Sequence, residues 1–341
     1  MCCLRPYRLG LRIIKNVKDR FGRNIEYMRI SVTDRCDLRC RYCMPEEGIE
    51  KVDKSRILSY EQILRVCEAA ILNGITKFKI TGGEPLVRYD LIKLVRGIKA
   101  LDGTEQVTIT TNGQRLSEYL DDLIDAGVDG INISLDTLKA DRYEYITRVG
   151  VLDKTLEAID LCIEKGVNTK LNCLLQKDFN QDETVNIADF AMDKGIAVRF
   201  IEMMPIGFAD AGRGVSSEET LEILKKAYPD LTEDDEKHGN GPAVYYKVPS
   251  RNGTIGIISS VHGKFCESCN RIRLTSMGML KPCLCYDSGR NLKPFLEAPI
   301  EGLRAIMHDA VTEKPKAHCF ENVADHKREK TERHAMSEIG G

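Results

Sequence analysis

The stretch YMRISVTDRCDLRCRYC, residues 27–43, joins the two features that decide the fold. Its first part, Tyr27–Val32, is short, apolar and contains β-branched residues, which predicts a strand. Directly after it, Cys36, Cys40 and Cys43 place three thiols on one loop. The stretch therefore predicts a strand whose carboxyl end carries a metal-binding loop.

The same strand-then-helix unit repeats from Ile25 to Glu202. Most predicted helices are followed by a glycine, which is a common helix stop. The predicted strands are Tyr27–Val32, Thr76–Ile80, Gln106–Thr110, Gly130–Ser134, Asn168–Leu174 and Ala197–Ile201. The predicted helices are Tyr60–Leu72, Leu91–Ala100, Ser117–Ala126, Lys154–Glu164 and Gln181–Lys194.

Regular alternation of strands and helices predicts an α/β fold with a parallel sheet. Six units without a dinucleotide-binding fingerprint favour a partial (βα)6 TIM-like barrel over an open doubly wound sheet. In a barrel the active site lies in the loops after the strands. Polar and glycine-rich segments fall at four of these places: Thr81–Pro85, Thr110–Gly113, Ser134–Asp136 and Glu202–Pro205.

The rhythm stops after Met204 and suggests four regions along the chain. We expect an N-terminal extension at 1–24, the barrel at 25–228, a C-terminal cluster-binding region at 229–312 and a charged tail at 313–341. The acidic, glycine-containing segment 229–242 is expected to be a connection. Strands are predicted at Val244–Val248 and Thr254–Ile258, and the charged stretch Glu313–His334 is expected to be a solvated tail or helix.

Composition excludes several classes of protein. The 341 residues are 42% hydrophobic and 30% charged, which excludes a disordered chain. A net charge of −2 argues against a nucleic-acid binder, and no apolar run is long enough to span a membrane. Arg12 interrupts the apolar stretch near the start, so a signal peptide is not expected. Thirteen cysteines without a secretory signal then indicate metal sites in a reducing compartment, the cytoplasm.

The cysteines form two groups that suggest metal binding. Cys36, Cys40 and Cys43 lack a nearby fourth Cys or His, so an iron–sulfur cluster with one open iron is favoured over structural zinc. The second group is Cys266, Cys269 and Cys283. A four-cysteine zinc knuckle that adds Cys285 is an alternative there, although Cys-x-Cys is not the usual zinc spacing. Cys67, Cys162 and Cys173 are expected to be buried, inert thiols.

These motifs resemble those of known enzymes. The first group resembles the signature of radical S-adenosylmethionine enzymes, with Tyr42 at the usual aromatic position. Gly82–Pro85, read Gly-Gly-Glu-Pro, is similar to the element of that family that holds the methionine amino group. The string CESCNRIRL at 266–274, with the terminal Gly340 and Gly341, resembles the GTP 3′,8-cyclases of molybdenum cofactor biosynthesis. The resemblance covers about Ile25 to Tyr286 and the last residues.

The resemblance implies two [4Fe–4S] clusters and S-adenosylmethionine as cofactors. The reaction it implies converts GTP to (8S)-3′,8-cyclo-7,8-dihydroguanosine 5′-triphosphate through a 5′-deoxyadenosyl radical. It also implies an electron donor and a downstream cyclic pyranopterin monophosphate synthase as partners, with a homodimer as one expected assembly.

The resemblance also implies roles for single residues. Contacts to S-adenosylmethionine are expected from Tyr42, Gly83, Ser134 and Met204. Contacts to GTP are expected from Arg29, Lys79, Thr110, Lys170, Arg271 and Arg273, and catalytic roles from Arg271, Arg273, Gly340 and Gly341. Related sequences often carry arginine at position 79. Lys77 would face the same side of its strand, but Lys79 lies closer to the carboxyl end, so a surface role fits Lys77 better.

Two other functions remain open on the sequence. One is a different radical S-adenosylmethionine enzyme with an auxiliary cluster, such as a peptide-modifying enzyme, although such enzymes usually carry a longer C-terminal cysteine array. The other is a non-catalytic iron–sulfur or zinc protein, which would not need the Gly-Gly-Glu-Pro element or the bases near the strand ends.

Overall fold

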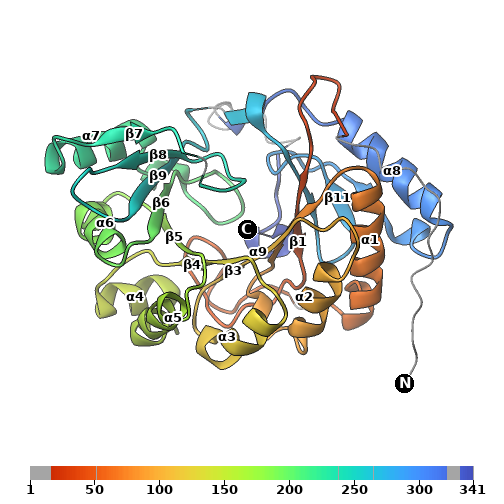
Figure 1. The fold of residues 1–341 in the computed structure, drawn as a ribbon, viewed down its shortest axis with the longest axis horizontal. Helices are drawn as coiled ribbons and strands as arrows, with labels where there is room; N and C mark the ends of the chain where they lie inside the picture. The colour runs from red at the N-terminus through yellow and green to blue at the C-terminus, as the bar shows by residue number, and fades with distance from the viewer. Residues whose placement is uncertain (1–16, 51, 237, 264, 321–330, 341) are drawn as a thin grey trace.

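A computed structural model describes residues 17–50, 52–236, 238–263, 265–320 and 331–340. Its centre is one open sheet in the order β12-β11-β10-β1-β2-β3-β4-β5-β6-β9-β8-β7 (Figure 1). Neighbours from β10 through β9 are parallel, and the pairs at both edges are antiparallel. The strands are β1 (Tyr27–Ser31), β2 (Lys77–Thr81), β3 (Gln106–Thr111), β4 (Gly130–Ser134), β5 (Thr169–Leu174), β6 (Ala197–Ile201), β7 (Thr232–Asp234), β8 (Val244–Lys247), β9 (Thr254–Ile258), β10 (Arg271–Leu274), β11 (Met279–Lys281) and β12 (Arg290–Asn291).

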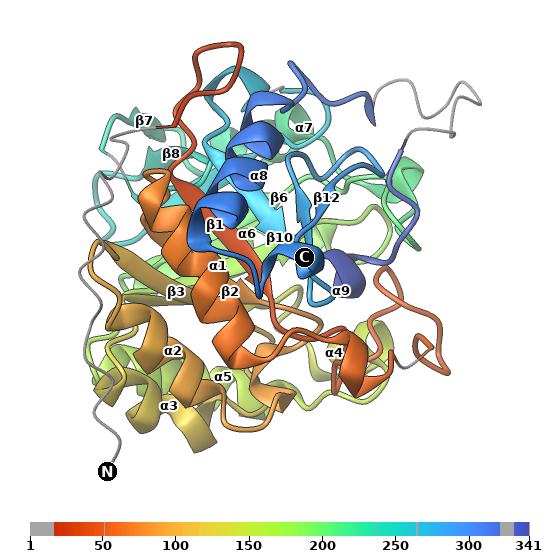
Figure 2. The same ribbon diagram turned by 90° about the vertical axis from the view of Figure 1, so that its right-hand side faces the viewer.

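Helices cover the outer face of the curved sheet, except the short C-terminal helix Met336–Ile339, which lies at the strand ends (Figures 1 and 2). They are α1 (Tyr60–Leu72), α2 (Leu91–Lys99), α3 (Leu116–Asp125), α4 (Ala140–Thr147), α5 (Leu152–Glu164), α6 (Thr184–Asp193), α7 (Ser217–Ala227), α8 (Ile300–Thr312) and α9 (Met336–Ile339). Short 3-10 helices lie at Lys54–Arg56, Pro85–Val87, Gln181–Glu183, Ala211–Arg213, Phe265–Ser268 and Lys293–Phe295.

Local sequence explains why these elements form where they do. Ser59 begins α1 with a capping box, in which its hydroxyl accepts from the Gln62 amide and the Gln62 side chain accepts from the Ser59 amide. Gly74 follows the helix with φ +82°, a conformation that glycine adopts without strain. The apolar faces of α1, α2, α3 and α5 then pack against the sheet in one large core.

The expected barrel strands are confirmed, and the sheet continues beyond them. β9 extends the sheet in parallel beside β6, and β10 does the same beside β1. Arg273 of β10 lies opposite Arg29 of β1. The C-terminal region therefore returns to the first strand and adds its own residues to the same face.

Two expectations for the C-terminal part were wrong. The segment 229–242 is not only a connection, because β7 lies within it and pairs with β8. The solvation expected for Glu313–His334 is also wrong in its described part, since Lys314, His318 and Glu332 are buried there. The last described segment, residues 331–340, buries Ser337 and Ile339 as well. A buried ion pair between Glu332 and Lys281 of β11, and apolar packing of Ile339, hold this segment against the body. In the described part of the chain, no helix has the length and apolar character needed to cross a membrane.

Candidate active site

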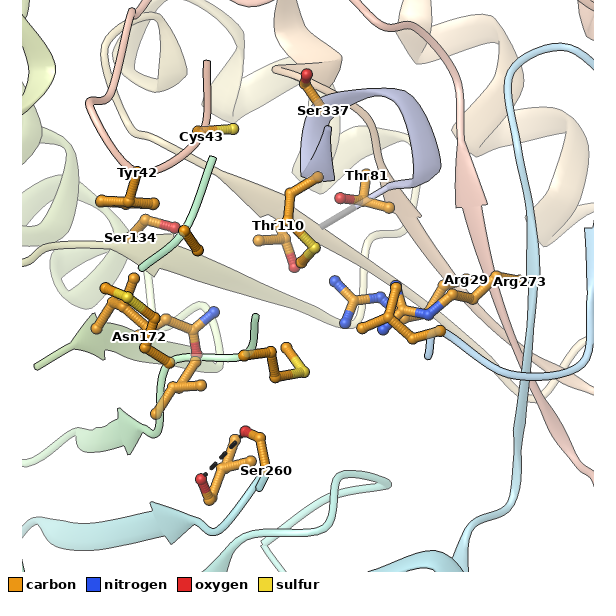
Figure 3. Close-up of a pocket in the computed structure, with 18 of the residues that line it drawn as sticks. Arg29, Tyr42, Cys43, Thr81, Thr110, Ser134, Asn172, Ser260, Arg273 and Ser337 are labelled. Carbon is orange, nitrogen blue, oxygen red and sulfur yellow. Dashed lines mark hydrogen bonds between the residues drawn. The ribbon is translucent and has the colours of Figure 1, made fainter. Parts of the chain in front are cut away.

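A cavity of about 350 Å³ opens at the carboxyl ends of the strands (Figure 3). Both predicted cysteine groups line it: Cys36, Cys40 and Cys43 from the loop after β1, and Cys266, Cys269 and Cys283 from the segments before β10 and after β11. The two groups are more than 220 positions apart in the chain. The fold therefore brings two sets of three thiols to one hollow, a place that the strand-end argument predicted for the first set only.

The first cysteine loop is held by backbone contacts on both sides. The Leu38 amide donates to Cys36 Sγ at 3.4 Å, and the Cys43 amide donates to the Cys40 carbonyl at 2.9 Å. The Tyr42 hydroxyl donates to Asp136 after β4 at 2.8 Å. This hydrogen bond connects the cysteine loop to the segment that follows β4.

Glycine is required where the loop after β2 meets the cysteine loop. A Cβ on Gly83 would lie 2.4 Å from the Arg35 carbonyl oxygen, a distance that no side chain tolerates. The next residue, Glu84, is buried and accepts hydrogen bonds from the Thr111 hydroxyl and the Asn112 amide. Burial raises the pKa of Glu84 to about 7. The Gly-Gly-Glu-Pro element therefore packs directly against the loop of Cys36.

A second hollow of about 140 Å³ adjoins the first and is rich in positive charge. Arg29, Arg271 and Thr110 line both hollows and mark their junction. The basic side chains that line the second hollow are Arg29, Lys79, Lys170, Arg199 and Arg271. Like charges gathered in a partly buried space repel one another, so the hollow is suited to a polyanion.

The pKa values of the lysines reflect this crowding. Burial, with Arg199, Arg29 and other nearby cations, holds the pKa of Lys79 well below its usual value. Burial and Arg199 lower the pKa of Lys170 to about 8. Lys77, by contrast, pairs with Glu26 at 3.0 Å at the other end of the strand and is not among the residues that line this hollow.

The end of the chain enters the first hollow. Met336 and Ser337 of α9 line it, and Arg273 donates from Nη1 to the Gly340 carbonyl at 2.6 Å. In Figure 3, Arg29 and Arg273 lie side by side, with Tyr42 and Ser134 on the opposite side of the pocket. Gly341 lies outside the described residues.

The comparisons with known proteins agree with this arrangement. Residues 30–191 match the model of the Radical SAM superfamily, and residues 196–320 match that of Molybdenum Cofactor Synthesis C. A protein of Clostridium perfringens (strain 13 / Type A) named GTP 3′,8-cyclase is 41% identical over 95% of this chain and 100% of its own length. The chain belongs to the GTP 3′,8-cyclase family. A relative from Pelotomaculum thermopropionicum with the same name is 42% identical over 95% of this chain and all of its own length.

The fold has a more distant solved neighbour. Streptococcus suis SuiB bound to S-adenosylmethionine superposes with a TM-score of 0.61 at 15% identity, over 92% of this chain and 77% of that one. At this identity the likeness supports the radical S-adenosylmethionine fold and nothing finer.

The cysteine sets fit the two [4Fe–4S] clusters of a GTP 3′,8-cyclase. Burial raises the pKa of the Cys43 thiol to about 11 and also raises that of Cys40, so bare thiolates there are unfavourable without a cation. Although burial opposes it, the charges of Lys314 and Arg271 lower the pKa of Cys269 to about 7. Soft thiolate donors in sets of three match iron–sulfur ligation with one open iron at each site.

The other predicted residues of this family member divide between the two hollows. The first hollow is lined by the four residues expected at S-adenosylmethionine: Tyr42, Gly83, Ser134 and Met204. Lys79 and Lys170 line the second hollow only, whereas Arg273 lines the first and contacts the tail. The individual ligand contacts of these residues stay predictions.

Arg199 of β6 and Lys314, which lines the first hollow, are basic residues that sequence reasoning missed. Arg199 carries the clearer signal. It lies in the apolar strand Ala197–Ile201, is buried, and donates from Nη2 to Asn132 Oδ1 of β4. A Cβ on Gly256 would lie 2.9 Å from its Cγ, so glycine leaves room for the arginine stem. An arginine inside an otherwise apolar barrel strand was the signal that could have identified it.

Proposed function

We infer that this chain converts GTP to (8S)-3′,8-cyclo-7,8-dihydroguanosine 5′-triphosphate for molybdenum cofactor biosynthesis. The observation that carries the inference is the shared cavity: two sets of three cysteines line one hollow, which continues into a pocket of basic side chains. The curated relatives named GTP 3′,8-cyclase support it over nearly the whole chain.

The first hollow is proposed to hold S-adenosylmethionine beside Cys36, Cys40 and Cys43. When bound, the first cluster and S-adenosylmethionine supply a 5′-deoxyadenosyl radical. Gly83 brings the loop after β2 close to the cysteine loop, and Ser134 lines the same hollow beside Tyr42 (Figure 3). These residues would hold the cofactor in the first hollow, which meets the second hollow at Arg29, Thr110 and Arg271.

The second hollow is proposed to hold the triphosphate of GTP. Lys79, Lys170 and Arg199 line it away from the cysteines, while Arg29 and Arg271 stand at the junction. A bound triphosphate would neutralise the positive charge of each of these side chains. The arginines would donate hydrogen bonds to phosphate oxygens through their planar, forked guanidinium groups. Cys266, Cys269 and Cys283 line the first hollow and would hold the second cluster, which would bind the guanine.

The tail is proposed to close the reaction space. Arg273 holds the Gly340 carbonyl, and Ser337 reaches the wall near Cys43 (Figure 3). A hydrogen atom would pass from C3′ of GTP to the 5′-deoxyadenosyl radical, which becomes 5′-deoxyadenosine. A bond would then form from C3′ to C8, and one electron from the donor and one proton from solvent would complete the ring. A docked tail would keep small reductants and oxygen away from the carbon radical between these events.

The reaction also requires partners that the chain does not contain. We place the enzyme in the cytoplasm, where thiols stay reduced, with a one-electron donor and a cyclic pyranopterin monophosphate synthase that consumes the product.

The test is an anaerobic incubation of the iron-loaded protein with GTP, S-adenosylmethionine and dithionite, followed by chromatography and mass spectrometry of the nucleotide. We expect a new nucleotide with the mass of GTP but a different retention time, formed together with 5′-deoxyadenosine. Formation of 5′-deoxyadenosine with unaltered GTP, in protein loaded with both clusters, would refute the proposed substrate.

A further inference from the structure

A pair of thiols lies beside the second cysteine set and takes no part in the proposed reaction. The sulfur atoms of Cys285 and Cys319 are 3.5 Å apart, and the Cys319 amide donates to Cys285 Sγ at 3.3 Å. Cys285 is fully buried, whereas Cys319 is partly exposed. The residues are 34 positions apart in the chain, so the fold and not the local sequence brings them together.

The pair is already close to the geometry of a disulfide. A disulfide needs a sulfur–sulfur distance of about 2.0 Å, so the two atoms must approach by about 1.5 Å. The hydrogen bond from the Cys319 amide to Cys285 Sγ holds the backbone of Cys319 next to the sulfur of Cys285. Cys67 and Cys162, in contrast, are buried in the main core among aliphatic side chains.

The position of the pair connects two parts of the proposed active site. Cys285 lies two residues after Cys283 and belongs with Ile339 to a small apolar cluster under α9. The Cys285 carbonyl also accepts a hydrogen bond from the Glu332 amide at 2.8 Å, near the start of the last described segment, residues 331–340. A change in the position of Cys285 is therefore passed to the second cysteine set and to the tail.

We propose that Cys285 and Cys319 are a modification site that forms a reversible disulfide and thereby slows cyclisation. The oxidant is a small organic disulfide. The more exposed Cys319 sulfur attacks it and releases one small thiolate, and the Cys285 sulfur then displaces the second. Two protein thiols and one small disulfide give one protein disulfide and two small thiols, so the protein sulfurs lose two electrons and the small disulfide gains them.

The effect on the reaction rests on the proposed function. A displacement of 1 Å in a reacting site can cost about a hundredfold in rate. We therefore expect the oxidised protein to cyclise GTP about ten- to a hundredfold more slowly.

The experiment uses the iron-loaded protein under anaerobic conditions with oxidised glutathione. Free thiols are then alkylated, and a non-reducing digest is mapped by mass spectrometry while iron is measured on the same sample. We expect a linked peptide pair containing Cys285 and Cys319, two hydrogens lighter than the sum, with the iron content unchanged. Linkage that appears only after iron is lost, or no linkage, would overturn the proposal.

The activity arm uses two matched variants. Cys319→Ser should cyclise GTP at the untreated rate after oxidation, while Cys162→Ser, which removes a core thiol, should slow as the unsubstituted protein does. Dithiothreitol should restore the rate of the oxidised protein. A linked protein that cyclises at full rate would refute the effect on the reaction. If the protein does not cyclise GTP at all, the proposed function fails, and the peptide map still decides whether the thiol pair oxidises.

Discussion

Gly340→Ala tests the tail as part of the reaction space. Gly340 has φ +78°, and a Cβ there would lie 2.9 Å from Ser31 Cβ and 3.1 Å from Thr81 Cγ2. Both neighbours belong to the ends of adjacent barrel strands, so they have little room to retreat. The docked tail must therefore accept strain or move its carbonyl away from Arg273.

The expected weakening follows from these contacts. Alanine at positive φ costs about 1–2 kcal/mol, and loss of the hydrogen bond from Arg273 costs about 1.5–3 kcal/mol. Docking of the tail should weaken by about 2.5–5 kcal/mol in all, which lowers the equilibrium constant for docking roughly 60- to 4,000-fold. We expect cyclisation to fall in proportion, while slow cleavage of S-adenosylmethionine and the affinity for GTP persist.

The assay compares the rates of nucleotide cyclisation and of 5′-deoxyadenosine formation in the same anaerobic reaction. Gly166→Ala is the matched control, because Gly166 has φ +69° after α5 and no atom within 4 Å of the added Cβ. This substitution introduces the same kind of backbone strain at a site outside the cavity, so it should leave the rate of cyclisation unchanged. Wild-type cyclisation by Gly340→Ala protein would show that the tail has no part in the reaction.

Other predictions address the clusters and the basic hollow. Cys43→Ala should abolish formation of 5′-deoxyadenosine; a near wild-type rate would disprove the first cluster site. Cys269→Ala should lose cyclisation but keep slow, uncoupled cleavage, measured as 5′-deoxyadenosine without a new nucleotide. Arg199→Gln should weaken GTP binding about ten- to a hundredfold by calorimetry, with S-adenosylmethionine affinity as the internal control. GTP affinity should also fall as pH rises through about 8, because Lys170, whose pKa lies there, loses its charge above that value; a Lys170→Met protein should show a flatter pH profile.

The barrel strands could be predicted because local patterns determine them. The predicted strands Gly130–Ser134 and Ala197–Ile201 match β4 and β6 residue for residue, since short β-branched runs end at polar turns. The predicted helix at Gln181–Lys194 is divided, however, into a 3-10 turn and α6. Helix α4 was not predicted because the alternating pattern assigned only one helix between β4 and β5. Helices α7, α8 and α9 were not predicted because they follow β6, where the predicted alternation ends.

The site was predictable as a set of residue types but not as a shape. The cysteine spacing and the strand-end rule placed Cys36 and Gly83 together, because both follow neighbouring parallel strands. The contact of Arg273 with Gly340 and the pairing of β10 with β1 depend on packing between distant segments. No local pattern encodes such contacts, and the same is true of the approach of Cys285 to Cys319.

The transfer of hydrogen from GTP tests the central claim most directly. GTP carrying deuterium at C3′ is incubated anaerobically with the iron-loaded protein, S-adenosylmethionine and dithionite, and 5′-deoxyadenosine is isolated for mass spectrometry. The account predicts 5′-deoxyadenosine that is heavier by one deuterium, in step with the cyclised nucleotide, which has lost it. Unlabelled 5′-deoxyadenosine alongside a nucleotide that retains its deuterium would contradict the account.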